Sequence, residues 1–160
     1  MTPEQSVVAS VVHAWKQNLE RADKLFSTLS EQDLQREVGP GKNRLVYLWG
    51  HLIAVHDAML PLLGLGERLH PELDDAFLKN PDRVVADSLS AADLKRLWNE
   101  VNQRLVAAFG AFTAAEWTEK HTVVSAEDFA VNPLRNRLSI LLSRTSHVSY
   151  HLGQAALAPR

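Results

Sequence analysis

Two histidines near the end of the chain are spaced to bind one metal ion. His147 and His151 lie four residues apart in a segment with helical periodicity, and positions i and i+4 share one face of a helix. A third histidine, His51, has a similar helical setting. A fold that places it opposite the pair would give a three-histidine site with one coordination position open for water or substrate. The pair alone is weak evidence, because seven histidines in 160 residues give roughly 0.3 such pairs by chance.

Polar neighbours of these histidines are candidates for roles in the same site. Arg144 precedes His147 by one helical turn, where it can meet an anionic group of a substrate or form a salt bridge with a carboxylate on an adjacent helix. Gln154 and Tyr47 are placed to hydrogen-bond and orient an imidazole. Arg144 and Tyr47 are therefore the candidates for a catalytic role. Two partly exposed histidines near a helix C-terminus are still the simpler explanation of the pair taken alone.

The remaining histidines do not extend the motif. His56 follows His51 by five residues, which turns it well round the helix, so we do not expect a fourth ligand there. His13 falls on the polar side of its helix, and His70 and His121 fall in loops, so all three are expected to face solvent. A di-iron bundle needs two Glu-x-x-His motifs, and the chain offers one, at Glu67. The HExxH motif of zinc proteases is absent.

Composition limits the chemistry further. The chain has no cysteine, so a metal must be held by histidine, carboxylate or water, and any thiol must come with the substrate. A formal net charge of -2 provides no basic surface of the kind that nucleic-acid binding requires. Hydrophobic residues at 46% and a length of 160 residues suit one globular domain, residues 1-160.

One apolar stretch tests the expectation of a soluble protein. Residues 45–63 are nearly continuous apolar sequence, about the length of a membrane span. The stretch contains two histidines and Asp57, which are costly at bilayer depth, so a helix buried in a bundle is the better interpretation and no membrane is expected. The Met-Thr-Pro-Glu-Gln start lacks the cationic and apolar regions of a signal peptide, and we expect a cytoplasmic protein.

The periodicity predicts four long helices. Apolar residues recur with spacings of three and four from Val8 to Leu29 and again from Leu94 to Phe112, the second run following a cap at Ser90. Another helix is expected over 43–63, and a fourth is expected to open at Asn132-Pro133 and run to about 157. Residues 67–85 and 120–131 show no convincing period. The expected fold is all-α, a four-helix bundle with long crossover connections.

The residues also resemble a known family. Trp49-Gly-His51-Leu, together with His147-x-x-x-His151-x-Gly-Gln154, is similar to the DinB/YfiT-like superfamily of small metal-binding proteins, and the resemblance covers the whole chain. It implies a four-helix bundle with a long-crossover topology and a divalent metal ion, zinc or nickel, bound by His51, His147 and His151. It also implies a homodimer.

The same resemblance implies candidate activities. Members include thiol-dependent S-transferases and isomerases that use low-molecular-weight thiols, and others are described as metal-dependent hydrolases. Several are associated with stress. No Asp or Glu lies on the histidine faces as a general base, which weighs against a hydrolase. We therefore expect a metal-dependent transferase or isomerase acting on a small-molecule substrate. A hydrolase, and a non-catalytic stress-associated interaction protein with a structural or vacant metal site, are the alternatives.

Overall fold

The protein folds into helices joined by irregular segments. A computed structural model describes residues 1–159, and within that range there are two isolated β-bridges and no strand, which confirms the expected all-α class. The helical elements, in chain order, are α1 (Pro3–Phe26), α2 (Glu31–Leu34), α3 (Leu45–Asp57), α4 (Met59–Leu62), a 3₁₀ turn η1 (Pro71–Leu73), a π-helix η2 (Asp75–Lys79), α5 (Ala91–Ala111), α6 (Ala114–Thr118), α7 (Ala126–Val131) and α8 (Arg137–Ala156).

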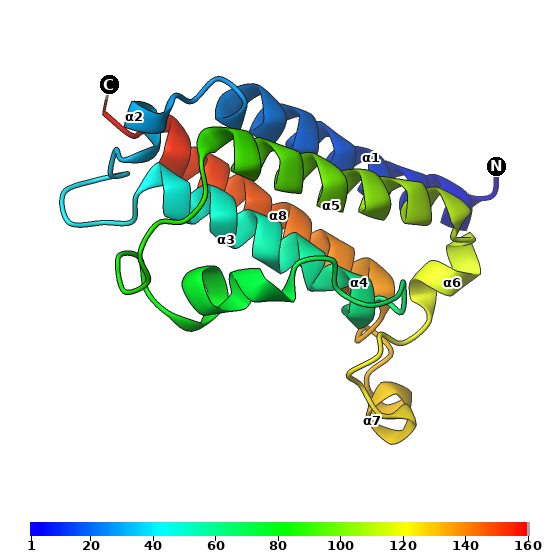
Figure 1. Ribbon diagram of the computed structural model, residues 1–160. Coiled ribbons are helices and arrows are strands. Elements are labelled where there is room, and N and C mark those ends of the chain that lie inside the picture. The colour runs from blue at the N-terminus through cyan, green and yellow to red at the C-terminus, as the bar shows by residue number, and fades with distance from the viewer. Residues whose placement is uncertain (160) are drawn as a thin grey trace.

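The four long helices α1, α3, α5 and α8 pack side by side (Figure 1). Helices α3 and α8 run antiparallel, since Arg137 at the start of α8 donates to the carbonyl of Leu63 just beyond α4. Helices α3 and α5 run parallel. Arg44 binds Asp87 where both helices begin, and Arg104, late in α5, donates to the Leu65 carbonyl beyond α4. The chain between these parallel neighbours therefore returns along the length of the bundle.

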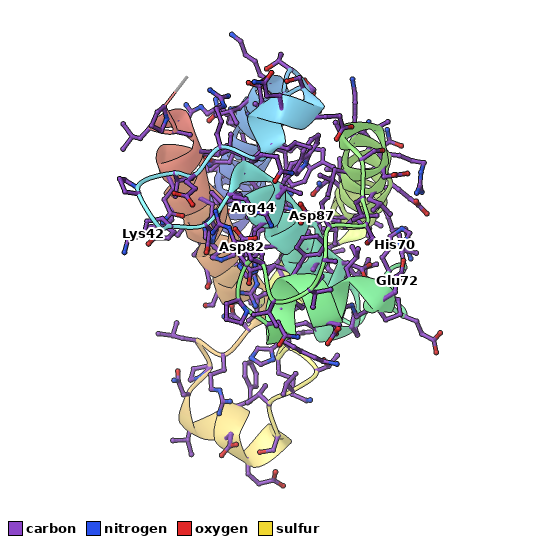
Figure 2. All side chains as sticks on the ribbon, turned by 60° about the vertical axis from the view of Figure 1, so that its left-hand side comes forward. Lys42, Arg44, His70, Glu72, Asp82 and Asp87 are labelled. Atoms are coloured by element: carbon purple, nitrogen blue, oxygen red, sulfur yellow. The ribbon has the colours of Figure 1, made fainter. Side chains whose placement is uncertain are left out.

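Residues 64–90, which we call the crossing segment, are anchored to α3 by charged side chains. Near its far end, Asp82 and Asp87 both bind the Arg44 guanidinium at the start of α3, a cluster visible in Figure 2. Near its beginning, the fully buried carboxylate of Asp57 accepts the N–H groups of Leu69 and His70. Charge-assisted bonds of this kind are stronger than neutral ones. The segment is therefore fixed against α3 at two points.

The core lies between the long helices and is rich in aromatic residues. Trp15 of α1, Trp49 of α3 and Trp117 of α6 are almost fully buried, and Phe26 stacks on Trp49 with ring centroids 5.2 Å apart. Residues Leu45–Leu62 are the one stretch of the described chain apolar and long enough to cross a membrane, and 72% of that stretch is buried inside the protein. Such burial is what the central helix of a bundle shows.

The fourth helix begins later than predicted. Asn136 caps α8 by accepting the N–H of Ser139, whereas Asn132 ends the short helix α7 and its side chain accepts the N–H of Leu134 in a local turn. Asparagine serves equally well as a helix N-cap and as the first residue of such a turn, so Asn132-Pro133 forms the turn between α7 and α8 and not the predicted start of the fourth helix. Helix α7 lies in residues 120–131, where no period was recognised, and projects from the bundle in Figure 1.

Two of the loop histidines were also placed wrongly. His121 is buried. The side chain of His70 is only 13% exposed, because it lies between Glu72 of η1 and Glu100 of α5, with Glu72 beside it in Figure 2. His13 is exposed on α1, as expected. A loop position in sequence does not exclude burial when the loop packs on a helix.

Candidate metal centre

Three histidines from two helices converge at the contact between α3 and α8. The Nε2 atom of His147 lies 3.2 Å from that of His51 and 3.0 Å from that of His151. All three side chains are partly exposed, and together they form the one group of the described residues whose ligand atoms are close enough to hold a metal ion. The pairing inferred from sequence, of a distant histidine with the i, i+4 pair, is present in the structure.

The ring of His51 is oriented by the crossing segment. Its Nδ1 lies 2.8 Å from the carbonyl oxygen of Phe77, and because a carbonyl can only accept, Nδ1 carries the proton. The lone pair is therefore on Nε2, which faces the other two histidines. Gly50 makes this contact possible, since a Cβ there would lie 2.3 Å from the Phe77 ring. The glycine lets the π-helix η2 approach α3 closely enough for its backbone to reach His51.

The ring of His151 is oriented within its own helix. Its Nδ1 lies 2.7 Å from Gln154 Oε1, and the amide nitrogen of Gln154 donates to the hydroxyl of Tyr150 at 3.2 Å. The amide therefore presents its oxygen to the ring, which places the proton on Nδ1 and leaves the Nε2 lone pair toward His147. Hydrogen bonds to the rear nitrogen of a ligating imidazole fix its tautomer and increase its basicity. Gln154 has the orienting role that its position suggested.

The donor set fits a cation. With both outer rings protonated on Nδ1, His147 has at most one Nε2–H to donate, so the lone pair of the other outer ring faces the His147 nitrogen with no proton between them, which is a repulsive contact. A cation among the three Nε2 atoms removes this repulsion. Tetrahedral zinc with bonds of about 2.0–2.1 Å sets ligand nitrogens about 3.3 Å apart, close to the separations of His147 from its two neighbours. Two of the three nitrogen separations are therefore close to those of tetrahedral zinc, and the ligand atoms of all three histidines lie within 4.8 Å of one another.

Burial favours the neutral form of two of the three rings, His147 and His151. Burial, with smaller contributions from His151, His51 and Arg144, lowers the pKa of His147 to about 4. Burial also lowers the pKa of His151, although its hydrogen bond with Gln154 acts in the opposite direction. Neutral imidazole is the form that binds metals, so protons compete little with a metal for these two rings at pH 7.

The two catalytic candidates take different positions. Tyr47 stacks parallel to the ring of His51 at 6.1 Å, but its hydroxyl donates to the carbonyl of Asn80 at 2.8 Å. The expectation that this hydroxyl serves His51 is wrong, because the Phe77 carbonyl already holds that ring. Arg144 lies beside His147 and makes no salt bridge among the described residues. The adjacent-helix carboxylate considered as its partner is therefore not present there.

Sequence reasoning did not find Phe77. Its contribution is a backbone carbonyl, which every residue possesses, so residue type carries no signal for it. The pattern that could have indicated it is Gly50 directly before His51, because a glycine inside a buried helix often marks a close backbone approach.

The whole-chain pattern has a counterpart among known families. The family model described as the DinB superfamily matches residues 14–155. The chain belongs to the DinB superfamily. No curated protein matches it. The matched range of this DinB protein contains all of α3, α5 and the three histidines, and it ends one residue before the end of α8. Family and geometry together are compatible with a divalent metal site.

Proposed function

We propose that His51, His147 and His151 bind one divalent metal ion, zinc or nickel, and that the site acts on a small-molecule thiol in a transferase or isomerase reaction. The observation that carries the proposal is the convergence of three Nε2 atoms, two of them with their rear nitrogens held by Phe77 and Gln154. When bound there, a divalent ion supplies a Lewis acid with an open coordination position, which lowers the pKa of a thiol or water ligand.

The chain's own residues define what else the site does. Phe77 and Gln154 hold two imidazoles in fixed orientation, and the Tyr47 ring lies parallel to His51. The candidate ligand cluster contains three histidines and no carboxylate, so a general base for hydrolysis is not provided by the cluster itself. Because the chain has no cysteine, a reacting thiol must be part of the substrate. These features favour thiol transfer over hydrolysis.

The test is metal stoichiometry in protein purified without a histidine tag. After incubation with zinc or nickel and removal of free metal, we expect about one metal per chain by elemental analysis, and His147→Ala and His151→Ala each should abolish binding. His13→Ala is the matched control, because His13 is exposed on α1 and should leave stoichiometry unchanged. Less than about 0.2 metal per wild-type chain would overturn the proposal and favour a non-catalytic interaction protein.

A further inference from the structure

Arg144 is a half-buried cation without a partner. Its Nε is buried and meets no acceptor, and the guanidinium forms no hydrogen bond or ion pair with any described residue. The other well-buried arginines of the described chain are all paired. Arg44 binds Asp82, Arg68 binds Asp57 and Arg137 binds Glu119, with arginine side chains 11%, 16% and 18% exposed. Arg144 therefore differs from the other well-buried arginines, each of which is paired with a carboxylate.

The position of Arg144 relates it to the metal centre. It precedes His147 by three residues, and on the α8 surface it lies between the histidines and the buried side chains of Leu141 and Val148. The charge of Arg144 makes a small contribution to the lowered pKa of His147, as expected for a cation one helical turn away. The guanidinium is thus held beside the histidine cluster and partly out of solvent.

Such an arrangement is costly in the absence of an anion. Withdrawing a cation from water without a counterion is unfavourable, and a guanidinium cannot lose its proton at neutral pH to avoid that cost. Its planar fork of N–H donors is complementary to a carboxylate or a phosphate. Arg144 supplies one positive charge, which balances the single negative charge of a carboxylate but not the larger charge of a phosphate. A carboxylate is therefore the favoured ligand group.

We propose that Arg144 binds the carboxylate of a ligand whose donor atom occupies the open position of the metal centre. The inference rests on the proposed function and adds the chemical class of the substrate, a thiol that carries a carboxylate. Because Arg144 precedes His147 by about one helical turn on the same side of α8, the thiol and the carboxylate should be close together on the ligand, as in a short-chain mercaptocarboxylate. Arg144 would then select the ligand and position its sulfur.

The experiment compares two probes of nearly the same size and shape, one with a carboxylate and one with an uncharged amide. Wild-type protein loaded with cobalt(II), whose absorption bands report a new ligand, is titrated with 3-mercaptopropionate and with uncharged 3-mercaptopropanamide. We expect the carboxylate to bind about 10- to 100-fold more tightly, the range for hydrogen bonds to a charged group. Arg144→Met should make the two affinities equal, and Arg144→Lys should retain part of the preference because it keeps the charge without the fork.

Controls separate this inference from the proposed function. Arg96→Met, on an exposed face of α5, should keep the full preference for 3-mercaptopropionate. Equal affinities of the two probes for cobalt-loaded wild type, no response to either, or a preference that survives Arg144→Met would overturn the role of Arg144 while leaving the metal site intact. Failure of wild type to take up one equivalent of cobalt would overturn both. Cobalt uptake and circular dichroism of each variant show that it is folded.

Discussion

His51 and His56 lie five residues apart on the same helix, and the protein uses them in opposite ways. His51 is partly exposed and meets two further histidines from α8. His56 is fully buried, its Nδ1 donates to Asn102 Oδ1 at 2.7 Å, and its ring lies 4.7 Å from that of Trp15. Asn102 in turn donates to the Trp98 carbonyl, which fixes its oxygen toward His56. The difference shows that the opposing helix, not the residue type, decides whether a histidine is a candidate ligand or part of the core.

The largest expected effect separates the two histidines by substitution. His51→Gln should weaken zinc affinity roughly 100- to 1,000-fold, because about 10–16 kcal/mol of binding is shared among the ligands of a zinc ion. His56→Gln should leave zinc affinity unchanged but lower the free energy of unfolding by roughly 1–3 kcal/mol, since it disturbs a buried hydrogen bond. Competition titration with a zinc chelator and urea denaturation measure the two quantities. Similar zinc affinities for the two variants would contradict the assignment of His51 as a metal ligand and His56 as a core residue.

Acid should reveal the second expected effect. Burial lowers the pKa of His56 from 6.5 to about 3. Between these two pH values, His56 is protonated in the unfolded chain but stays neutral in the folded protein. This contribution to stability is therefore fully present above pH 6.5 and is lost as the pH falls toward 3. Between pH 8 and 4.5 the loss is on the order of 3 kcal/mol. The measurement is urea denaturation of metal-free protein across this range.

His56→Gln is the reference for that measurement. The variant retains the other titrating groups, His147 and His151 included, so subtracting its pH profile from that of wild type isolates His56. The difference should shrink on acidification with a slope of about 1.4 kcal/mol per pH unit. Parallel profiles would mean that His56 is accessible to protons in the folded state and is no different from a surface histidine.

The smallest expected effect concerns orientation of the metal-site rings. Gln154→Leu removes the acceptor of His151 Nδ1 without removing a ligand, and zinc affinity should fall roughly 10- to 100-fold, as for other partners of ligating histidines. Stability without metal should change little. Gln103→Leu, at an exposed position of α5, is the matched control and should bind zinc as wild type does. A Gln154→Leu protein with full zinc affinity would show that helix geometry alone orients His151.

Sequence reasoning succeeded where periodicity and local spacing carry the information. The apolar spacing located α1 and α5, the cap at Ser90 was assigned correctly, and the i, i+4 rule paired His147 with His151. His51 joined them through its helical setting and the family resemblance. The exclusion of His56 as a ligand also followed from helical angle, since its ring meets Asn102 on another helix.

The errors have a common physical origin. Each error depends on how an irregular segment packs against a helix, which neither periodicity nor residue type encodes. The errors are the role of Asn132, the burial of His70 and His121, and the hydrogen-bond partner of His51. The lack of a carboxylate near Arg144 is also set by the tertiary structure and not by the local sequence. In sequence, the chain offers 19 acidic residues as partners for it, and the fold places none of the described ones there.

The bond between His51 and the Phe77 carbonyl has a consequence for motion. Coupling between two sites is reciprocal. If the bond from the crossing segment to His51 strengthens metal binding, a bound metal stabilises the folded crossing segment by the same free energy. If η2 opens locally, His51 loses its acceptor and the ring is free to turn; if a metal holds the ring, opening of η2 becomes rarer. Amide hydrogen exchange in residues 75–79 should therefore slow as metal concentration rises. The exchange rate of this segment, which supplies no metal ligand, would then report how much of the site is occupied.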